Sequence, residues 1–422
     1  YEIGLITTLP ADRVEISFAS TLGSMNVFNA IFKCFSEGPA LACNTRTILR
    51  EPTYPVTVDK NTSGLLNVGL LGQNILNLDY ILDADTTNYA TVNQSLANVG
   101  NGLQISVKKS LSPFPGGYYA GFDIGQAGVL ALDLMDNLGV ATYLNGTLQE
   151  TVTGSGSLLN LGTSLLNGDG RKLIGFKTDP LKPFNEIRLV STGSVALNVL
   201  KQLRIYGVVA QQFCAGTALA CNMPVSMTQP QYPVYVDGKF TSNSGLIAVA
   251  GAINTSENVI DADTATFASI DMTAGVGTTT TFAVTDAVTN YTANTYVAFD
   301  IAINKLVSVD VLNAIRIRLI KDGVLLNTVY TPSLVAGVGA AAGEQRQRIG
   351  IIATEEFDGA QLVVDGIVNV GLLGTLKVYG VSFEKLCAAP LLCNQTVELK
   401  NGQNPVVIND VRTGALGLAN VT

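Results

Sequence analysis

Short runs in which hydrophobic and polar residues alternate recur along the whole chain. Examples are residues 55–59, 119–124 and 142–148. Alternation with a period of two places successive side chains on opposite faces of a β-strand. Turn residues separate these runs at intervals of about ten residues, which is typical of antiparallel sandwiches. The pattern predicts an all-β protein with about eight short strands in each half of the chain.

The series of runs occurs twice, which indicates a tandem array of similar units. Residues 34–213 and 214–386 are each expected to form one complete β-sandwich, and the two should follow one another in a linear array. Residues 1–33 are expected to be the closing part of a preceding repeat, and residues 387–422 the start of a following one. The matching segments are 55–59 with 233–237, 80–86 with 258–264, 119–124 with 296–301, and 142–148 with 319–325.

Two of the turns have a strong hairpin signature. Asn145-Gly146 and Asp322-Gly323 each separate two alternating runs. A two-residue type I′ turn needs a positive φ at both central positions, which Asn-Gly and Asp-Gly tolerate. We therefore expect a β-hairpin at the same place in each unit.

The composition excludes several classes of function. The 422 residues include no histidine and no tryptophan, so Ser-His-Asp catalysis and histidine-ligated zinc are ruled out. The formal net charge is −8, and no basic cluster is present that could line a nucleic-acid groove. No apolar run is long enough to cross a bilayer. The chain is expected to require no cofactor, with Ca²⁺ as the one candidate.

The six cysteines fall in three close pairs along the sequence. An even number of cysteines in local pairs predicts three small disulfide loops and an oxidising, extracytoplasmic compartment. Reduced thiol pairs or metal-ligand pairs are the alternatives, although these spacings are longer than that of Cys-x-x-Cys. The pairs are Cys34 with Cys43, Cys214 with Cys221, and Cys387 with Cys393.

An Asp-Ala-Asp-Thr segment is repeated at corresponding places in the two units. It contributes Asp83 and Asp85 to the first unit, and Asp261 and Asp263 to the second. Two carboxylates on one side of a loop, together with backbone carbonyls, could bind Ca²⁺. The alternative is that these aspartates accept hydrogen bonds from backbone N–H groups of their own turns.

Several segments resemble the galactose-binding-like jelly rolls of discoidin type. In that family an Asp-Gly-Asp-x-x-Thr segment follows the first strand, and here residues 260–267 occupy its place. Later strands of that family correspond to residues 299–301 and 378–380. Phe267 and Tyr89 stand where the family has tryptophan. The resemblance implies a jelly-roll fold, and it does not identify the loops that would hold a sugar.

The wider repeat, with Cys-Asn, Pro-Val-x-Val-Asp and Asp-Ala-Asp-Thr in this order, resembles the repeats of giant surface adhesins of Bacteroidota. Those adhesins are exported by the type IX route and linked to gliding motility. The resemblance implies an extracellular filament or stalk segment on the cell surface that mediates attachment and is not an enzyme. Its partners would be neighbouring repeats, surface polysaccharide or other cell-surface proteins. Thr86 and Thr264 also fit the O-glycosylation pattern associated with that phylum.

An array of carbohydrate-binding modules is the main alternative, and it requires polar and aromatic groups that converge at one surface. A hydrolase is a third candidate, since Glu355 and Glu356 are adjacent carboxylates. Glycoside hydrolysis, however, needs two carboxyl groups that face one another across a cleft. These two glutamates are expected to lie in a solvated turn.

Overall fold

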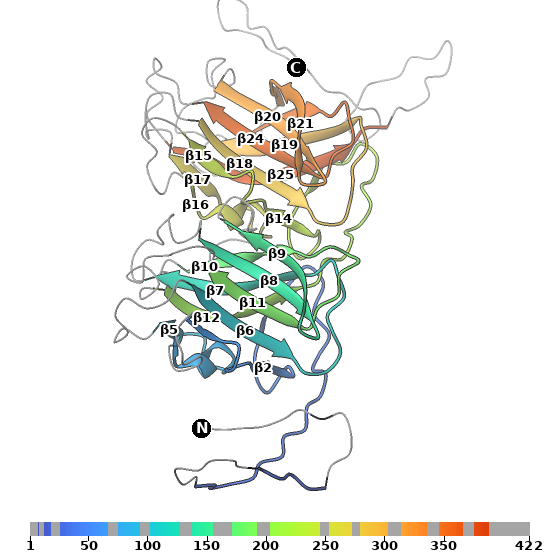
Figure 1. Ribbon diagram of the computed structural model, residues 1–422. Coiled ribbons are helices and arrows are strands. Elements are labelled where there is room, and N and C mark those ends of the chain that lie inside the picture. The colour runs from blue at the N-terminus through green and yellow to red at the C-terminus, as the bar shows by residue number, and fades with distance from the viewer. Residues whose placement is uncertain are drawn as a thin grey trace, which may run out of the picture.

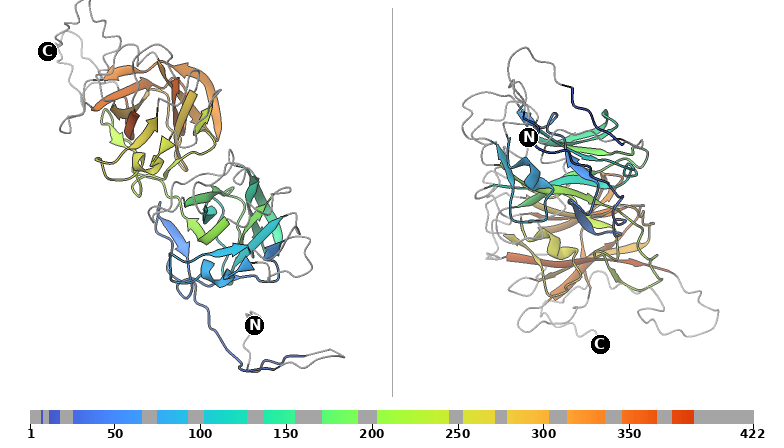
Figure 2. Two further views of the ribbon diagram at one scale, coloured as in Figure 1. Left: turned by 90° about the vertical axis from the view of Figure 1, so that its left-hand side faces the viewer. Right: turned by 90° about the horizontal axis from the view of Figure 1, so that it is seen from below.

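The computed structural model describes residues 7, 12–17, 26–65, 75–92, 102–126, 137–154, 171–191, 203–244, 253–271, 279–302, 314–335, 346–365 and 375–387. These residues form two β-sandwiches that follow one another along the molecule (Figures 1 and 2). No helix in the described part of the chain is long and apolar enough to cross a membrane.

The first sandwich consists of two antiparallel sheets. One sheet has the order β10 (Lys172–Lys177), β7 (Tyr119–Gln126), β12 (Leu203–Gln211), β5 (Ala90–Val92) and β4 (Ile75–Leu76), and β1 (Arg46–Leu49) also pairs with β12. The other has the order β2 (Val56–Val58), β6 (Leu103–Lys109), β11 (Glu186–Ser191), β8 (Leu138–Leu144) and β9 (Thr147–Thr153), and β3 (Gly64–Leu65) pairs with β6. A 3₁₀ helix, η1 (Leu78–Ile81), precedes β5.

The second sandwich repeats this plan. Its first sheet has the order β22 (Ser333–Val335), β23 (Arg346–Ile352), β19 (Thr295–Ala302), β25 (Thr375–Lys385), β17 (Ala268–Asp271) and β16 (Ile253–Asn254), and β13 (Val225–Ser226) pairs with β25. Its second sheet has the order β14 (Val234–Val236), β18 (Thr279–Asp286), β24 (Gly359–Asp365), β20 (Ile315–Lys321) and β21 (Val324–Tyr330), and β15 (Ser242–Ser244) pairs with β18. The 3₁₀ helix η2 (Ser256–Val259) precedes β17.

The strands of each sandwich pair in a nested way. In the first sandwich β1 pairs with β12, β6 with β11, β7 with β10, and β8 with β9. The corresponding pairs of the second are β13 with β25, β18 with β24, β19 with β23, and β20 with β21. This pairing of first strand with last is that of a jelly roll. The prediction of tandem antiparallel sandwiches is confirmed.

Each sandwich has its own hydrophobic core between the two sheets. Phe122 on β7 and Phe184 before β11 are fully buried in the first core. Phe299 on β19 and Phe357 before β24 take the same places in the second. The alternation seen in the sequence is explained by this burial, since every second residue of a central strand points into the core.

The two expected hairpins are present. Asn145 and Gly146 have φ values of 50° and 81° between β8 and β9. Asp322 and Gly323 have φ values of 50° and 71° between β20 and β21. Both residues of each turn are in the left-handed region, as a type I′ turn requires.

The predicted pairing of the cysteines is wrong. The bonds are Cys43–Cys214 and Cys221–Cys387, which close loops with sequence separations of 171 and 166 residues. Each bond joins the residue just before the first strand of a sandwich to a residue just after its last strand. The nested topology brings these ends together, because the first and last strands are neighbours in one sheet. Cys34 is exposed and not disulfide-bonded, and Cys393 lies outside the described residues.

The N-terminal residues do not form the expected strands. Residues 12–17 and 26–42 contain no strand, and most of their side chains are exposed. Phe28 and Ile31 are examples, with 88% and 69% of their surface exposed. The predicted opening strands within 394–422 lie outside the described residues.

The two sandwiches contact each other through a small hydrophobic cluster. Tyr119, Leu173 and Val209 of the first sandwich pack against Tyr235 and Ala287 of the second. The side chain of Asn44 joins the disulfide to both units: it accepts the N–H of Cys214 (2.8 Å) and donates to the carbonyl oxygens of Cys214 (3.1 Å) and Pro230 (3.0 Å). The junction is therefore a packed contact with directed hydrogen bonds.

Candidate binding site on the second sandwich

The repeated aspartates lie in turns and accept hydrogen bonds from their neighbours. Asp83 Oδ1 accepts the N–H of Asp85 (2.9 Å), and Asp83 Oδ2 accepts the side-chain amide of Asn88 (2.7 Å). Asp85 Oδ1 accepts both the N–H (2.8 Å) and the hydroxyl (2.7 Å) of Thr87. The Thr87 hydroxyl and N–H hold the pKa of Asp85 below its usual value. This is the geometry of the alternative interpretation, in which the aspartates stabilise the turn.

The second copy has the same turn. Asp261 Oδ1 accepts the N–H of Asp263 (3.0 Å), and Asp263 Oδ1 accepts the N–H of Ala265 (2.9 Å). Burial raises the pKa of Asp261, although the Thr266 hydroxyl opposes this shift. Among the described residues no group of three or more His, Cys, Asp or Glu side chains is placed to hold a metal ion. Ca²⁺ binding by Asp83, Asp85, Asp261 and Asp263 therefore stays a prediction.

The threonines of these turns are held through their backbones. Arg171 donates to the carbonyl oxygen of Thr86 (2.8 Å), and Arg346 donates to that of Thr264 (2.6 Å). The side chain of Thr86 is half-buried and that of Thr264 is exposed. Glycosylation of either threonine stays a prediction.

The aromatic residues that stand in place of tryptophan take part in a repeated stack. The ring of Tyr89 lies 5.4 Å from that of Tyr206, whose other neighbour is the guanidinium of Arg171 at 3.8 Å. In the second sandwich Phe267 lies 5.2 Å from Tyr379, and Arg346 lies 3.8 Å from Tyr379. The stack fixes the Asp-Ala-Asp-Thr turn against the sheet in both units, and this is a structural role.

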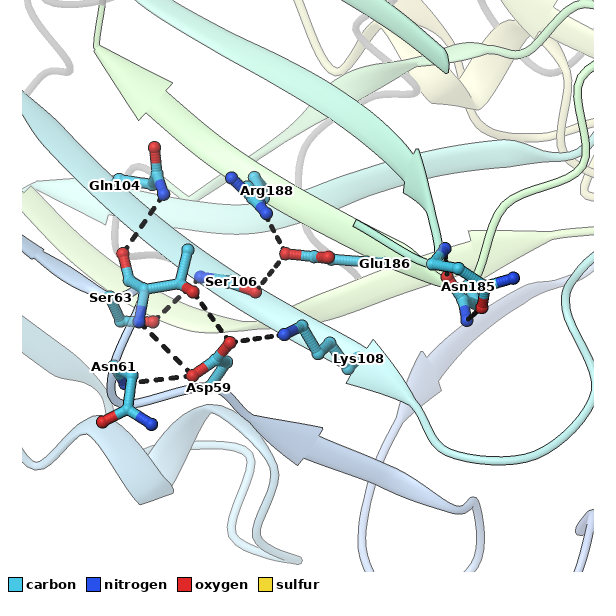
Figure 3. Close-up of polar contacts among 11 residues, drawn as sticks. Asp59, Asn61, Ser63, Gln104, Ser106, Lys108, Asn185, Glu186 and Arg188 are labelled. Carbon is cyan, nitrogen blue, oxygen red and sulfur yellow. Dashed lines mark hydrogen bonds and ion pairs between the residues drawn. The ribbon is translucent and has the colours of Figure 1, made fainter. Parts of the chain in front are cut away.

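The outward face of the β2–β9 sheet in the first sandwich carries a network of charged and hydroxyl groups (Figure 3). Glu186 accepts the hydroxyl of Ser106 (2.6 Å) and the guanidinium of Arg188. Arg188 also stacks on the ring of Tyr143 at 3.6 Å. Asp59 accepts from Lys108 at the neighbouring position. The charged groups on this face are thus paired with one another, although Glu186 Oε2 has no hydrogen-bond partner among the described residues.

Besides pairing with Lys108, Asp59 holds the turn that leads into β3. Its carboxylate accepts the N–H of Asn61 (3.0 Å) and the hydroxyl of Thr62 (2.7 Å). Burial would raise the pKa of Asp59, but the Lys108 ammonium and the Thr62 hydroxyl hold it below its usual value. The network is a built part of the first sandwich, and its charged groups are held in ion pairs within the protein.

The same face of the second sandwich has different residues at the corresponding positions. Gly359 on β24 replaces Glu186, since Gly359 pairs with Thr285 and Ile320 as Glu186 pairs with Lys108 and Tyr143. By the same register Gln361 replaces Arg188, and Ala283 replaces Ser106. The Glu186 carboxylate and the Arg188 guanidinium therefore have no equivalent in the second sandwich, while the strand pairing is retained.

A pocket of about 440 Å³ opens on this face of the second sandwich. Its apolar part is formed by Phe240 and Leu325, which belong to a small cluster on the outer side of the sheet. Its polar part includes the amide of Gln361, the hydroxyls of Thr279 and Thr281, and the basic residues Lys239, Arg316 and Arg318. An apolar surface with a few directed polar groups is the usual composition of a small-molecule site.

Two buried polar atoms at this pocket have no hydrogen-bond partner among the described residues. Gln361 is only 4% exposed, and its Nε2 donates to the carbonyl oxygen of Phe240 (2.8 Å). Its Oε1 is buried without a hydrogen bond, and so is Nε of Arg318. A buried polar atom without a partner costs roughly 1–3 kcal/mol, so such atoms are rare unless something else satisfies them. A bound molecule with hydrogen-bonding groups would remove this cost.

Sequence reasoning missed this pocket, although one signal was available. Arg316-Ile317-Arg318 alternates basic and apolar residues within a strand, and this places both guanidiniums on one face of the sheet. Gln361 gave no such signal, because its importance depends on neighbours from two other strands.

No protein family model matches the chain, and no curated protein sequence matches it. Among solved structures, the allantoicase of Saccharomyces cerevisiae is similar with 8% identity and a TM-score of 0.24, over 72% of this chain and 85% of that one. The paired CBM32 domains of Clostridium perfringens ZmpB in complex with GalNAc share 9% identity with a TM-score of 0.24, over 78% and 89%. The CBM32 domain of C. perfringens NanJ in complex with galactose shares 10% identity with a TM-score of 0.22, over 38% and 98%. Similarity at these values implies no ligand or activity for this chain.

Proposed function

We propose that this chain is a binding segment of an extracytoplasmic protein, and that its second sandwich holds a carbohydrate in the pocket on the β14–β21 sheet. On the equivalent face of the first sandwich, Glu186 pairs with Arg188 and Asp59 with Lys108, so we assign the site to the second sandwich alone. The observation that carries the proposal is the buried, unpaired Oε1 of Gln361 at the pocket. It is an acceptor that needs a hydroxyl or N–H donor from a ligand.

The chemistry of the pocket suits a sugar. A sugar ring presents hydroxyl groups at its edge and C–H groups on its faces. Gln361 supplies an acceptor, while Phe240 and Leu325 supply an apolar surface. The hydroxyls of Thr279 and Thr281 also line the pocket, where they bond to Asp365 (3.0 Å) and Ser242 (3.1 Å). The two disulfides favour an oxidising compartment, where extracellular polysaccharides are accessible.

A glycan array tests this proposal with a matched pair of variants. Gln361→Ala removes the unpaired acceptor, and Gln104→Ala removes an amide on the first sandwich that donates to the carbonyl oxygen of Thr62 (3.2 Å), as Gln361 donates to that of Phe240. Wild type and Gln104→Ala should bind the same glycans, and Gln361→Ala should bind them at least about tenfold more weakly. Calorimetric melting verifies that both variants fold. Absence of glycan binding by the wild type, or an equal loss in both variants, would contradict the proposal.

A role as a stalk or adhesive filament is the second candidate, and the packed junction between the sandwiches favours it. Tyr119 is fully buried there and Asn44 bonds to both units. A stalk must hold successive units in one orientation. Small-angle scattering of the chain should then fit a single arrangement of the two sandwiches, whereas a broad distribution of angles would count against this role.

A further inference from the structure

We propose that the sugar held by the second sandwich carries a carboxylate, so that the pocket recognises an acidic polysaccharide. This inference rests on the proposed function and specifies its ligand class. It is drawn from the charges around the pocket, the unpaired guanidinium atom of Arg318, and the loss of a counter-charge that the first sandwich retains.

The pocket combines three basic side chains with no acidic ones. Arg316 and Arg318 lie two residues apart on β20 and both line the pocket, as does Lys239. No aspartate or glutamate is among the described residues that line it. The whole chain has a formal net charge of −8, so this cluster runs against the average charge of the protein. Such a local excess of positive charge favours an anionic group.

Arg318 is the basic residue whose bonding capacity is least used. Its terminal nitrogen donates a long bond of 3.4 Å to the carbonyl oxygen of Leu326, and its Nε is buried with no partner in the part of the chain that the structure describes. No ion pair among the described residues includes Arg318. A guanidinium presents its N–H groups in a planar fork that matches the two oxygens of a carboxylate.

The first sandwich shows how an arginine on this face is normally neutralised. There Arg188 pairs with the buried Glu186 and stacks on Tyr143. In the second sandwich the place of Glu186 is taken by Gly359, and that of Tyr143 by Ile320. By the same register Gln361 takes the place of Arg188, and Arg318 takes the place of Ala141. Arg318 is therefore an added guanidinium on this face, with no carboxylate at the place of Glu186, and a ligand carboxylate would pair with it.

The two unpaired atoms together define the ligand. Gln361 Oε1 needs a donor, and Arg318 Nε needs an acceptor. A small inorganic anion would leave the amide oxygen unpaired, and a neutral sugar would offer no carboxylate to Arg318. A sugar acid provides hydroxyl donors and a carboxylate in one residue.

Isothermal titration calorimetry with three polysaccharides tests this inference. The probes are polygalacturonate, neutral galactan and dextran sulfate, and the proteins are wild type, Arg318→Gln and Lys385→Ala. Lys385 is exposed and does not line the pocket, so its replacement controls for the loss of one positive charge. We expect the wild type to prefer polygalacturonate, Arg318→Gln to bind it about 10–100-fold more weakly, and Lys385→Ala to match the wild type. Affinity should also fall with added salt.

A second pair of variants keeps the test independent of folding at Arg318. Val329 lines the pocket and is 53% exposed, so Val329→Glu and Val329→Gln should both fold. The glutamate variant should bind polygalacturonate at least about tenfold more weakly than the glutamine variant, which has nearly the same size and shape but carries no charge to repel the ligand.

The possible outcomes separate this inference from the proposed function. Galactan could bind the wild type as tightly as polygalacturonate, with this binding unaffected by Arg318→Gln and lost in Gln361→Ala. That result would overturn the acidic ligand and leave the carbohydrate site intact. Binding of dextran sulfate alone would overturn the carboxylate. Absence of glycan binding by the wild type would overturn the proposed function, and this inference with it.

Discussion

Asp358 and Asn185 occupy the same place in the two sandwiches and differ by one charge. Asp358 Oδ2 accepts the N–H of Asp322 (2.7 Å), as Asn185 Oδ1 accepts the N–H of Asn145 (2.9 Å). In the first sandwich the two asparagine side chains also bond to each other (2.9 Å). In the second, burial raises the pKa of Asp358 to about 6, and the charges of Asp322 and Asp237 add to this effect.

Replacing Asp358 with asparagine should stabilise the protein at neutral pH. Because the folded-state pKa of about 6 lies above the usual value of 3.8, the folded state binds more protons between these values. The free energy of unfolding should therefore fall as pH rises from about 4 to about 6, and the full cost of the buried carboxylate is present above pH 6. Asp358→Asn should gain roughly 1–3 kcal/mol at pH 7 and little at pH 3.5, as measured by urea unfolding.

The control for this change is Asp365→Asn, which neutralises an exposed carboxylate on the same strand. It should leave the pH dependence unchanged. A gain in Asp358→Asn that is equal at both pH values, or no gain at pH 7, would show that ionisation of this carboxyl does not limit stability.

The strands and hairpins are predictable from the sequence, because they depend on local patterns. The alternation of residues 119–124 predicts β7, and Asn145-Gly146 predicts the turn between β8 and β9. The pocket could not be predicted, because whether a sheet face is open depends on residues that meet across strands. Glu186 meets Tyr143 and Lys108 in one sandwich, and Gly359 meets Ile320 and Thr285 in the other. Only the pairing register reveals this difference.

The predicted pairing of the cysteines is wrong for a related reason. Nearness in sequence favoured Cys214 with Cys221, but the chain passes from one sandwich to the next between them. Isolated β-bridges pair Cys43 with Gln212 and Cys221 with Lys385. They place the first cysteine of each sandwich beside the end of the last strand of that sandwich. In a nested topology, residues that are far apart in sequence can thus lie close together in space.

The observed pairing defines the role of the disulfides in stability. Each bond closes its own sandwich and restricts its unfolded chain, so it should stabilise that sandwich rather than set the angle of the junction. The double variant Cys221→Ser with Cys387→Ser should destabilise the second sandwich by about 2–5 kcal/mol and leave the first nearly unchanged. Scanning calorimetry should show one transition moving to lower temperature. Unchanged melting of both sandwiches would contradict this role.

At the scale of the whole molecule, the orientation of the sandwiches depends on the contact between them. The rings of Tyr235 and Phe213 lie 6.2 Å apart, and Lys177 donates to the carbonyl oxygen of Ala287. Burial lowers the pKa of Lys177, although the charges of Asp358 and Asp286 oppose this shift. Apolar packing and charge complementarity thus act together at the junction.

Replacing Tyr235 with alanine should loosen this junction and leave both cores intact. Tyr235 is 7% exposed and lies in the contact cluster, outside the main core of its own sandwich. Small-angle scattering should show a broader distribution of interdomain distances in Tyr235→Ala than in wild type. The control is Val324→Ala on an exposed strand, where 62% of the side chain is in solvent. Identical scattering from all three proteins would show that the linker, rather than the packed contact, sets the orientation.

A crystal structure of the chain soaked with trigalacturonate would show whether a sugar binds on the outward face of the second sandwich. We expect sugar density over β18, β24 and β20, with a hydroxyl within hydrogen-bonding distance of Gln361 Oε1 and a carboxylate at Arg318. Density on the first sandwich, or at any other surface of the second, would contradict it.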